Sequence, residues 1–86
     1  MQIQPSTRKD KRYVAIFENK KIHFGSKGEA FIDHADKDKK KAYIARHRVN
    51  EDWTNPQKAG TLSRYILWDT PSLSKNISRF IGRFEL

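Results

Sequence analysis

The sequence contains no cysteine, and it has only four glycines and three prolines in 86 residues. Without cysteine there are no disulfides and no thiolate metal site, which fits a reducing compartment or a particle assembled in one. The longest apolar run, Tyr65 to Trp68, is far shorter than the roughly 20 residues that a membrane-spanning helix needs. The amino-terminal stretch M-Q-I-Q-P-S-T-R-K has no hydrophobic segment of the kind found in signal peptides. We therefore expect a protein that is not integral to a membrane.

Aromatic residues are abundant by contrast, with five Phe, three Tyr and two Trp. A chain of this length buries only roughly 60 to 65% of its unfolded surface. Each aromatic side chain removes roughly 150 to 250 Å² from water, which offsets that small size. The sequence thus predicts one small folded domain rather than a disordered basic tail.

Positive charge is concentrated in the first half of the chain. The net charge is +8. Residues 1–48 carry 13 Lys and Arg against 6 Asp and Glu, a net +7, whereas residues 49–86 carry 5 against 4, a net +1. This half is expected to attract a polyanion or an acidic protein surface, and salt should weaken the attraction.

The amino-terminal part predicts an arm followed by a β-hairpin. Residues 1–11 are polar and basic, so we expect a flexible basic arm that is either frayed or ordered by a partner. Residues 12–17 and 21–24 are rich in β-branched and aromatic residues and are separated by E-N-K, which is typical of a hairpin. Tyr13, Ala15 and Phe17 should share one face and Val14 and Ile16 the other. Ile22 and Phe24 should pair across on one face, while His23 points away.

Three helices are expected after the hairpin. Asp36 is a suitable N-cap for a helix reaching about Val49, whose apolar stripe includes Ala42 and Ala45. A turn at Asn55-Pro56 should lead into a buried central helix from about Gln57 to Trp68. Thr70 as N-cap and Pro71 at the first position predict a last helix with an apolar stripe through Phe84. The predicted fold is therefore α+β, with an N-terminal β-hairpin packed on about three short α-helices in a single compact domain, residues 12–86.

Cations lie in rows on two of these helices and in the arm. A solvated surface, phosphate contact and contact with an acidic protein surface all explain such rows. In the central helix, Arg64 is expected to pair with Glu51 or Asp52. The residues expected to contact a polyanion or acidic partner are Arg8, Lys9, Lys37, Lys40, Lys41, Arg46, Arg48, Lys75, Arg79 and Arg83.

No catalytic, cofactor or metal motif is present. The loop Gly25-Ser26-Lys27-Gly28 lacks the Walker pattern, and His23, His34 and His47 lack the i, i+4 spacing of a helical zinc site. The acids Asp33, Asp36 and Asp38 lack the glycine and glutamate of a calcium loop. We therefore expect no enzyme, no cofactor and no metal.

Four sequence segments resemble a small uncharacterised protein family of nucleocytoplasmic large DNA viruses. In chain order they are H-F-G-S-K-G, K-D-K-K-K-A-Y-I-A-R-H-R, E-D-W-T-N-P-Q-K-A-G-T-L-S-R-Y-I-L-W and P-S-L-S-K-N-I-S-R-F-I-G-R-F. The resemblance runs from about Arg12 to Phe84. It implies a viral source and carries no enzymatic activity over to this chain.

A short, basic, cysteine-free viral module without catalytic residues favours a particle component. We expect a minor capsid or virion-associated protein on the inner side of the shell, bridging larger capsid proteins after assembly in the host cytoplasm. The alternative is a nucleic-acid-binding accessory protein for genome packaging or condensation. Nucleic-acid binding should show a log–log salt slope of about 0.9 per phosphate neutralised on duplex DNA, whereas a bridging protein should occupy an ordered shell at fixed stoichiometry.

Overall fold

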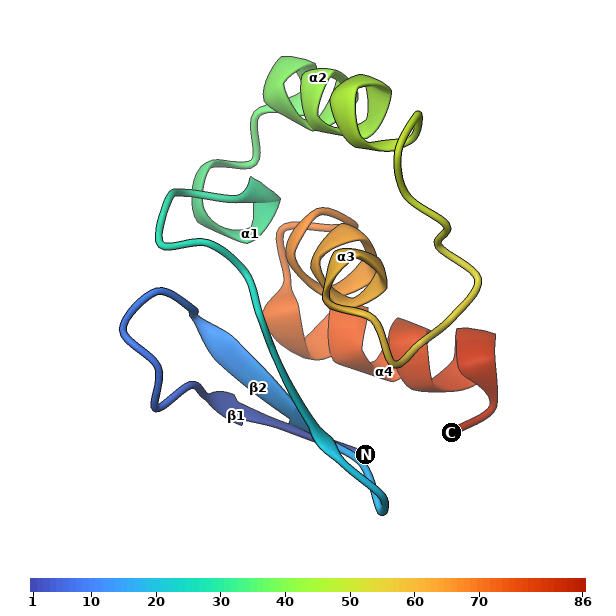
Figure 1. Ribbon diagram of the computed structural model, residues 1–86. Helices are drawn as coiled ribbons and strands as arrows, with labels where there is room; N and C mark the ends of the chain where they lie inside the picture. Colours follow the sequence, from blue (N-terminus) through green and yellow to red (C-terminus); the bar gives the residue numbers. More distant parts are fainter.

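The chain folds into a small sheet followed by a stack of short helices (Figure 1). A computed structural model describes all residues, 1–86. The antiparallel sheet has the order β1 (Gln2–Pro5), β2 (Tyr13–Ile16), β3 (Lys21–Phe24). The helices that follow are α1 (Phe31–His34), α2 (Lys37–His47), α3 (Ala59–Leu62), the π-helix η1 (Ser63–Leu67) and α4 (Leu73–Phe84). The α+β prediction is confirmed.

The predicted hairpin is present, and Ile22 and Phe24 share one face as predicted. Tyr13 lies opposite Phe24 and Ala15 opposite Ile22. Ala15 and Phe24 are fully buried on the face that meets the helices, as the alternation of apolar residues along a half-buried strand requires.

The first residues are not a flexible arm as predicted, because they form a third strand. Gln2 pairs with Ile16 and Pro5 with Tyr13, so β1 covers the free edge of β2, and Ile3 packs against the core. The Ser6 hydroxyl lies 2.7 Å from Nδ1 of His23, which ties the β1–β2 connection to β3. Backbone groups along β2 would otherwise lack partners on that side, so pairing favours an ordered strand.

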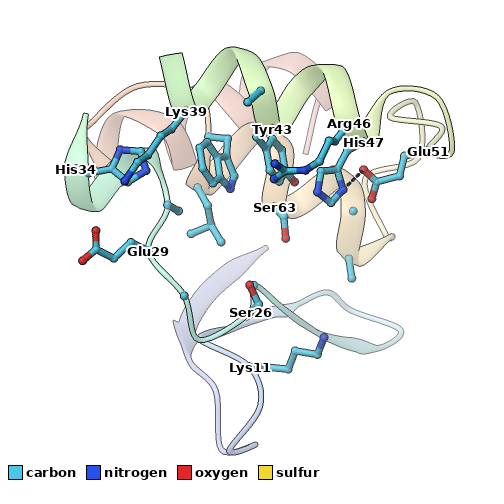
Figure 2. Close-up of a pocket in the computed structure, with 18 residues that line it drawn as sticks. Lys11, Ser26, Glu29, His34, Lys39, Tyr43, Arg46, His47, Glu51 and Ser63 are labelled. Atoms are coloured by element: carbon cyan, nitrogen blue, oxygen red, sulfur yellow. Dashed lines mark ion pairs between the residues drawn. The ribbon is translucent and has the colours of Figure 1, made fainter. Parts of the chain in front are cut away.

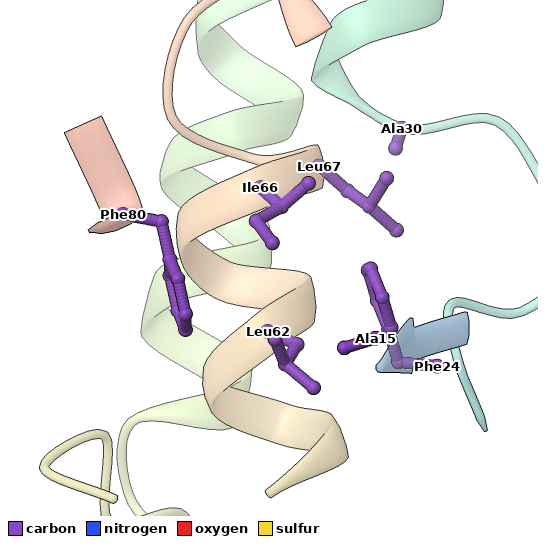
Figure 3. Packing of buried hydrophobic residues seen from close by; sticks show 7 residues of the cluster. All are labelled: Ala15, Phe24, Ala30, Leu62, Ile66, Leu67 and Phe80. Carbon is purple, nitrogen blue, oxygen red and sulfur yellow. The ribbon is translucent and has the colours of Figure 1, made fainter. Parts of the chain in front are cut away.

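The core lies on both sides of the segment formed by α3 and η1 (Figure 3). Leu62, Ile66 and Leu67 from this segment are buried. Phe80 of α4 packs on one side of the segment, and Phe24 and Ala15 of the sheet pack on the other. The central segment is therefore enclosed between layers, as its apolar pattern predicted.

The central helix is shorter than predicted and changes type within its length. It begins at Ala59 instead of Gln57 and becomes a π-helix from Ser63 to Leu67. Buried Asn76 of α4 caps the end of this segment, because its Nδ2 donates to the carbonyls of Ile66 and Thr70 (2.8 Å each). Its Oδ1 accepts from the backbone N–H of Thr70 at 3.0 Å. A side chain of another element thus satisfies one of the last carbonyls of the helix, which have no intrahelical partner.

Two capping and pairing predictions are wrong. The N-cap of α4 is Ser72 and not Thr70. The Ser72 side chain accepts from the backbone N–H of Lys75, and the Thr70 hydroxyl accepts from the backbone N–H of Ser72. Arg64 forms no ion pair with Glu51 or Asp52. Its guanidinium lies 5.0 Å from the Tyr65 ring centroid and donates to the carbonyl of Trp68 at 3.2 Å. Aromatic rings and a helix-end carbonyl therefore replace the expected carboxylates.

None of the helices combines the length and the apolar character needed to cross a lipid bilayer.

Candidate polyanion-binding cleft

The ten cations expected at the partner surface are not gathered into one patch. Arg8 and Lys9 lie in the β1–β2 connection, five lie on α2 or at its C-cap Arg48, and three lie on α4. The helices α2 and α4 lie on opposite sides of α3 and η1 (Figure 1). The structure therefore divides the predicted set among three regions.

Four of the ten cations are engaged within the protein. Arg8 pairs with Asp10 at 3.3 Å, and Arg79 pairs with Asp69 at 2.7 Å. The Arg83 guanidinium lies 4.2 Å from the ring centroid of Tyr65. These contacts occupy the three cations within the protein and reduce the charge available to a partner.

Lys40 is the clearest case of an engaged cation. Its Nζ donates to the backbone carbonyl of Asp69 at 2.6 Å, which fixes α2 to the segment after η1. Burial lowers the pKa of Lys40, and the nearby Arg64 guanidinium lowers it further. We therefore treat Lys40 as a structural residue rather than a contact residue.

The remaining exposed charge is concentrated on α2. Its N-cap Asp36 accepts from the backbone N–H groups of Asp38 and Lys39. Tyr43 is the only buried residue of the helix, and the predicted stripe of Ala42 and Ala45 is exposed. Alanine offers little area to bury, so a single aromatic side chain sets the inner face of α2.

Tyr43 belongs to a stack of rings that attaches α2 to η1. Its ring lies 4.3 Å from Trp68 with 5° between the planes, and His47 stacks on its other face at 4.2 Å. His34 of α1 meets Trp68 edge-on at 5.5 Å. Together these four rings, His34, Trp68, Tyr43 and His47, form what we call the aromatic column. Pairs of this kind contribute about 0.5–1.5 kcal/mol each beyond area burial.

The hydroxyl of Tyr43 is kept neutral. Burial raises the pKa of Tyr43, and the nearby Glu51 carboxylate raises it further. Tyr43 therefore remains uncharged beside the cations of α2 across the physiological range.

A cleft of about 850 Å³ opens beside the aromatic column, between α2 and the β3–α1 connection (Figure 2). All four rings of the column line it. Ser63 and Leu67 of η1 line it as well, so the π-helix forms part of the cleft wall. π-Helical turns occur frequently at functional sites.

Three cations and two acids line the cleft. Lys39 and Arg46 extend from α2, and Lys11 lies across the cleft on the sheet side. None of these three cations takes part in an ion pair. The acids are Glu29 and Glu51, so the cations exceed the acids by one.

Glu51 is the more engaged of the two acids. Its Oε2 lies 3.1 Å from Nδ1 of His47 and accepts from the indole N–H of Trp53 at 3.3 Å. Gly60 makes this position possible, because a Cβ there would overlap the Glu51 carboxylate. The charge of Glu51 is therefore largely met inside the protein, which leaves Glu29 as the unpaired acid at the cleft.

Sequence reasoning found Arg46 but missed Lys39, Lys11 and the aromatic column. The signal for Lys39 was present: Lys39 and Arg46 stand four residues before and three residues after Tyr43, which places them on the same side of a helix. The predicted contact residues instead followed rows of cations along the helix, and the buried position of Tyr43 was not taken into account. Lys11 gave no such signal, because its position depends on how the sheet packs.

These features define a small basic α+β domain with a cleft that is lined by aromatic rings and free cations. The chain belongs to a family of unknown function, DUF5754, whose profile matches residues 1–47. The matched part contains the whole sheet, α1 and α2, and therefore both cations that extend from α2 into the cleft. No curated protein and no solved structure matches the chain.

Proposed function

We propose that this protein is a non-enzymatic accessory protein that binds nucleic acid, with α2 as the element that contacts phosphates. One observation carries the proposal: α2 and its C-cap keep five exposed cations without an internal ion pair. These are Lys37, Lys39, Lys41, Arg46 and Arg48.

The contrast with α4 supports a binding role over simple solvation. Two of the three cations of the α4 row are held by Asp69 and Tyr65, whereas only Lys40 of the six Lys and Arg of α2 and its C-cap is held within the protein. Within α2 the only acid is Asp38. Lys and Arg side chains on such a helix can neutralise several phosphates and release the counterions condensed on nucleic acid.

The test compares two charge-reversal variants by fluorescence anisotropy on a labelled duplex over a range of salt concentrations. Lys37→Glu with Lys41→Glu changes the outer side of α2. Lys20→Glu with Lys75→Glu changes net charge by the same amount at exposed positions on the β2–β3 turn and α4. We expect the α2 variant to lose about tenfold or more in affinity and about 0.9 in salt slope for each lost phosphate contact. Equal losses in the two variants would mean that net charge alone drives binding, and the proposal would then fail.

A role as a minor capsid protein is the second proposal, supported by the resemblance to large DNA virus proteins and by the open edge of β1. That strand pairs only with β2, so its outer backbone groups are free to accept a strand from a larger protein. In this proposal the protein bridges larger capsid proteins on the inner side of the shell. A density map of the source particle is the test, with the chain expected at repeated shell positions. Its absence from those positions would rule out this role without bearing on nucleic-acid binding.

A further inference from the structure

We propose that the cleft beside the aromatic column binds single-stranded nucleic acid, with phosphates on Lys39 and Arg46 and a base against the rings. This inference rests on the proposed function and gives it a substrate class. It assigns the two sides of α2 different roles. The outer cations, such as Lys37 and Lys41, bind any polyanion, whereas the cleft accepts only a strand whose bases are unpaired.

The size and the lining of the cleft fit such a strand. Its volume of about 850 Å³ lies within the range of about 300–1,000 Å³ typical of ligand sites. Lys39 and Arg46 are seven residues apart, and α-helical rise separates their backbones by about 10.5 Å. Two cations at this spacing along one wall contact successive parts of a backbone rather than one small anion.

The aromatic column explains the preference for unpaired bases. Tyr43 and Trp68 already cover each other, so the terminal rings, His34 and His47, are the ones left to meet a ligand. The His47 side chain is 40% exposed. Base stacking on aromatic rings contributes about 1–3 kcal/mol per base and tolerates any base. In a duplex the faces of the bases are already stacked on their neighbours.

His34 also offers a directed hydrogen bond. Its Nδ1 accepts from the backbone N–H of Asp36 at 2.9 Å, so the neutral ring carries its proton on Nε2. That N–H is a donor for a base carbonyl or a phosphate oxygen. On the opposing side, Glu29 lines the cleft without an internal partner and should repel the backbone.

The experiment measures anisotropy of a fluorescein-labelled oligothymidine 12-mer and of a duplex of the same length. The cleft variant is Lys39→Ala with Arg46→Ala, and the matched control is Lys37→Ala with Lys41→Ala, which removes two cations from the outer side of the same helix. We expect the cleft variant to weaken single-strand binding about tenfold or more and duplex binding less than about threefold. We expect Glu29→Gln to strengthen single-strand binding alone.

A second readout uses Trp68 in the cleft wall. In a Trp53→Phe background Trp68 is the only tryptophan, and we expect the 12-mer to quench its fluorescence while the duplex does not. A cleft variant that weakens binding to the 12-mer and to the duplex by the same factor, with no quenching by the 12-mer, would overturn the cleft assignment and leave nucleic-acid binding by α2 intact. A wild-type protein that binds neither oligonucleotide would overturn both proposals.

Discussion

The ring of Tyr43 lies flat on the indole of Trp68, with 4.3 Å between the centroids, and this contact is the principal apolar attachment of α2. Tyr43 is 7% exposed, and no other residue of α2 is buried. The stability of the most basic helix therefore depends on one aromatic pair and on the Lys40 hydrogen bond.

Tyr43→Ala should release α2 while the rest of the domain stays folded. Truncating a large buried aromatic residue costs about 3–5 kcal/mol, and the core around Leu62 and Phe80 does not include Tyr43. Hydrogen exchange should show lost protection in residues 37–47 with retained protection in α4. Lys41→Ala, at an exposed position of the same helix, is the control. Simultaneous loss of protection in α2 and α4 would show that the helix does not unfold separately.

Alkaline pH should destabilise the wild-type protein more than Tyr43→Phe. Because the folded pKa of Tyr43 is raised by burial, its stabilising effect is complete below the unfolded pKa of about 10 and decreases as pH rises above it. Urea unfolding at intervals between pH 9 and 11.5 measures this. Tyr13 and Tyr65 remain in both proteins, so the difference between the two curves isolates Tyr43. Parallel curves would contradict the assignment.

Acid should remove the contribution of the Arg12–Asp33 pair. Hydrogen bonding to Arg12 lowers the pKa of Asp33, and Asp33 also accepts the backbone N–H of Ala30 at 2.7 Å. A carboxylate with a lowered folded pKa stabilises the fold above its unfolded pKa of about 3.9, and this is lost as pH falls through the folded value. Arg12→Ala should cost about 1 kcal/mol at pH 7 and less at pH 2. A cost that does not change with pH would point to packing by the Arg12 stem.

Asn76→Ala should be severely destabilising although it removes only a small polar side chain. The substitution leaves the carbonyl of Ile66 and the backbone polar groups of Thr70 without their partner. Unsatisfied buried groups cost about 1–3 kcal/mol each. We expect a loss of about 3 kcal/mol in urea unfolding. Ser78→Ala, exposed on the same helix, should change stability by less than about 0.5 kcal/mol, and a similar loss in both would argue against the network.

Two glycine-to-alanine substitutions should have opposite effects. Gly25 has a φ of +83°, and a Cβ there would lie 2.8 Å from Cδ1 of Leu67, so Gly25→Ala should cost about 2 kcal/mol. Gly82 lies in α4 with nothing within 4 Å of an added Cβ. Gly82→Ala should therefore stabilise the protein by up to about 1 kcal/mol. Thermal unfolding of the two variants measures both effects, and a shift of the same sign would contradict the stated geometry.

Local patterns were sufficient to predict the hairpin and α2, but not β1. Alternation along residues 12–24 predicted the hairpin and placed Ile22 and Phe24 on one face, and Asp36 as N-cap predicted the start of α2. The segment Gln2–Pro5 has a single large apolar residue, Ile3, so only the open edge of β2 makes it a strand. The π-helix was equally out of reach, because no local pattern marks it and the carbonyl of Ile66 near its end is satisfied by Asn76 from another element.

For the site, the sequence predicted the kind of charge but not which cations are free. In the sequence, Lys40 and Arg79 lie in the same kind of helical row as Lys41 and Arg48, so periodicity alone did not distinguish them. The structure separates them because Asp69, after η1, lies where both Lys40 and Arg79 reach it. Contacts of this kind depend on the tertiary structure, so the sequence periodicity of either helix does not reveal them.

The π-helix also determines how many residues the chain can hold between Leu62 and Trp68. A turn closed by i→i+5 hydrogen bonds holds one residue more than a regular α-helical turn, so the π-helix Ser63–Leu67 already accommodates one extra residue before Trp68. Deleting one residue would return the segment to a regular α-turn, whereas inserting one would rotate Trp68 relative to α3 by about 100° and point the indole away from α2. We therefore expect single-residue insertions in this segment to be more damaging than deletions or many substitutions.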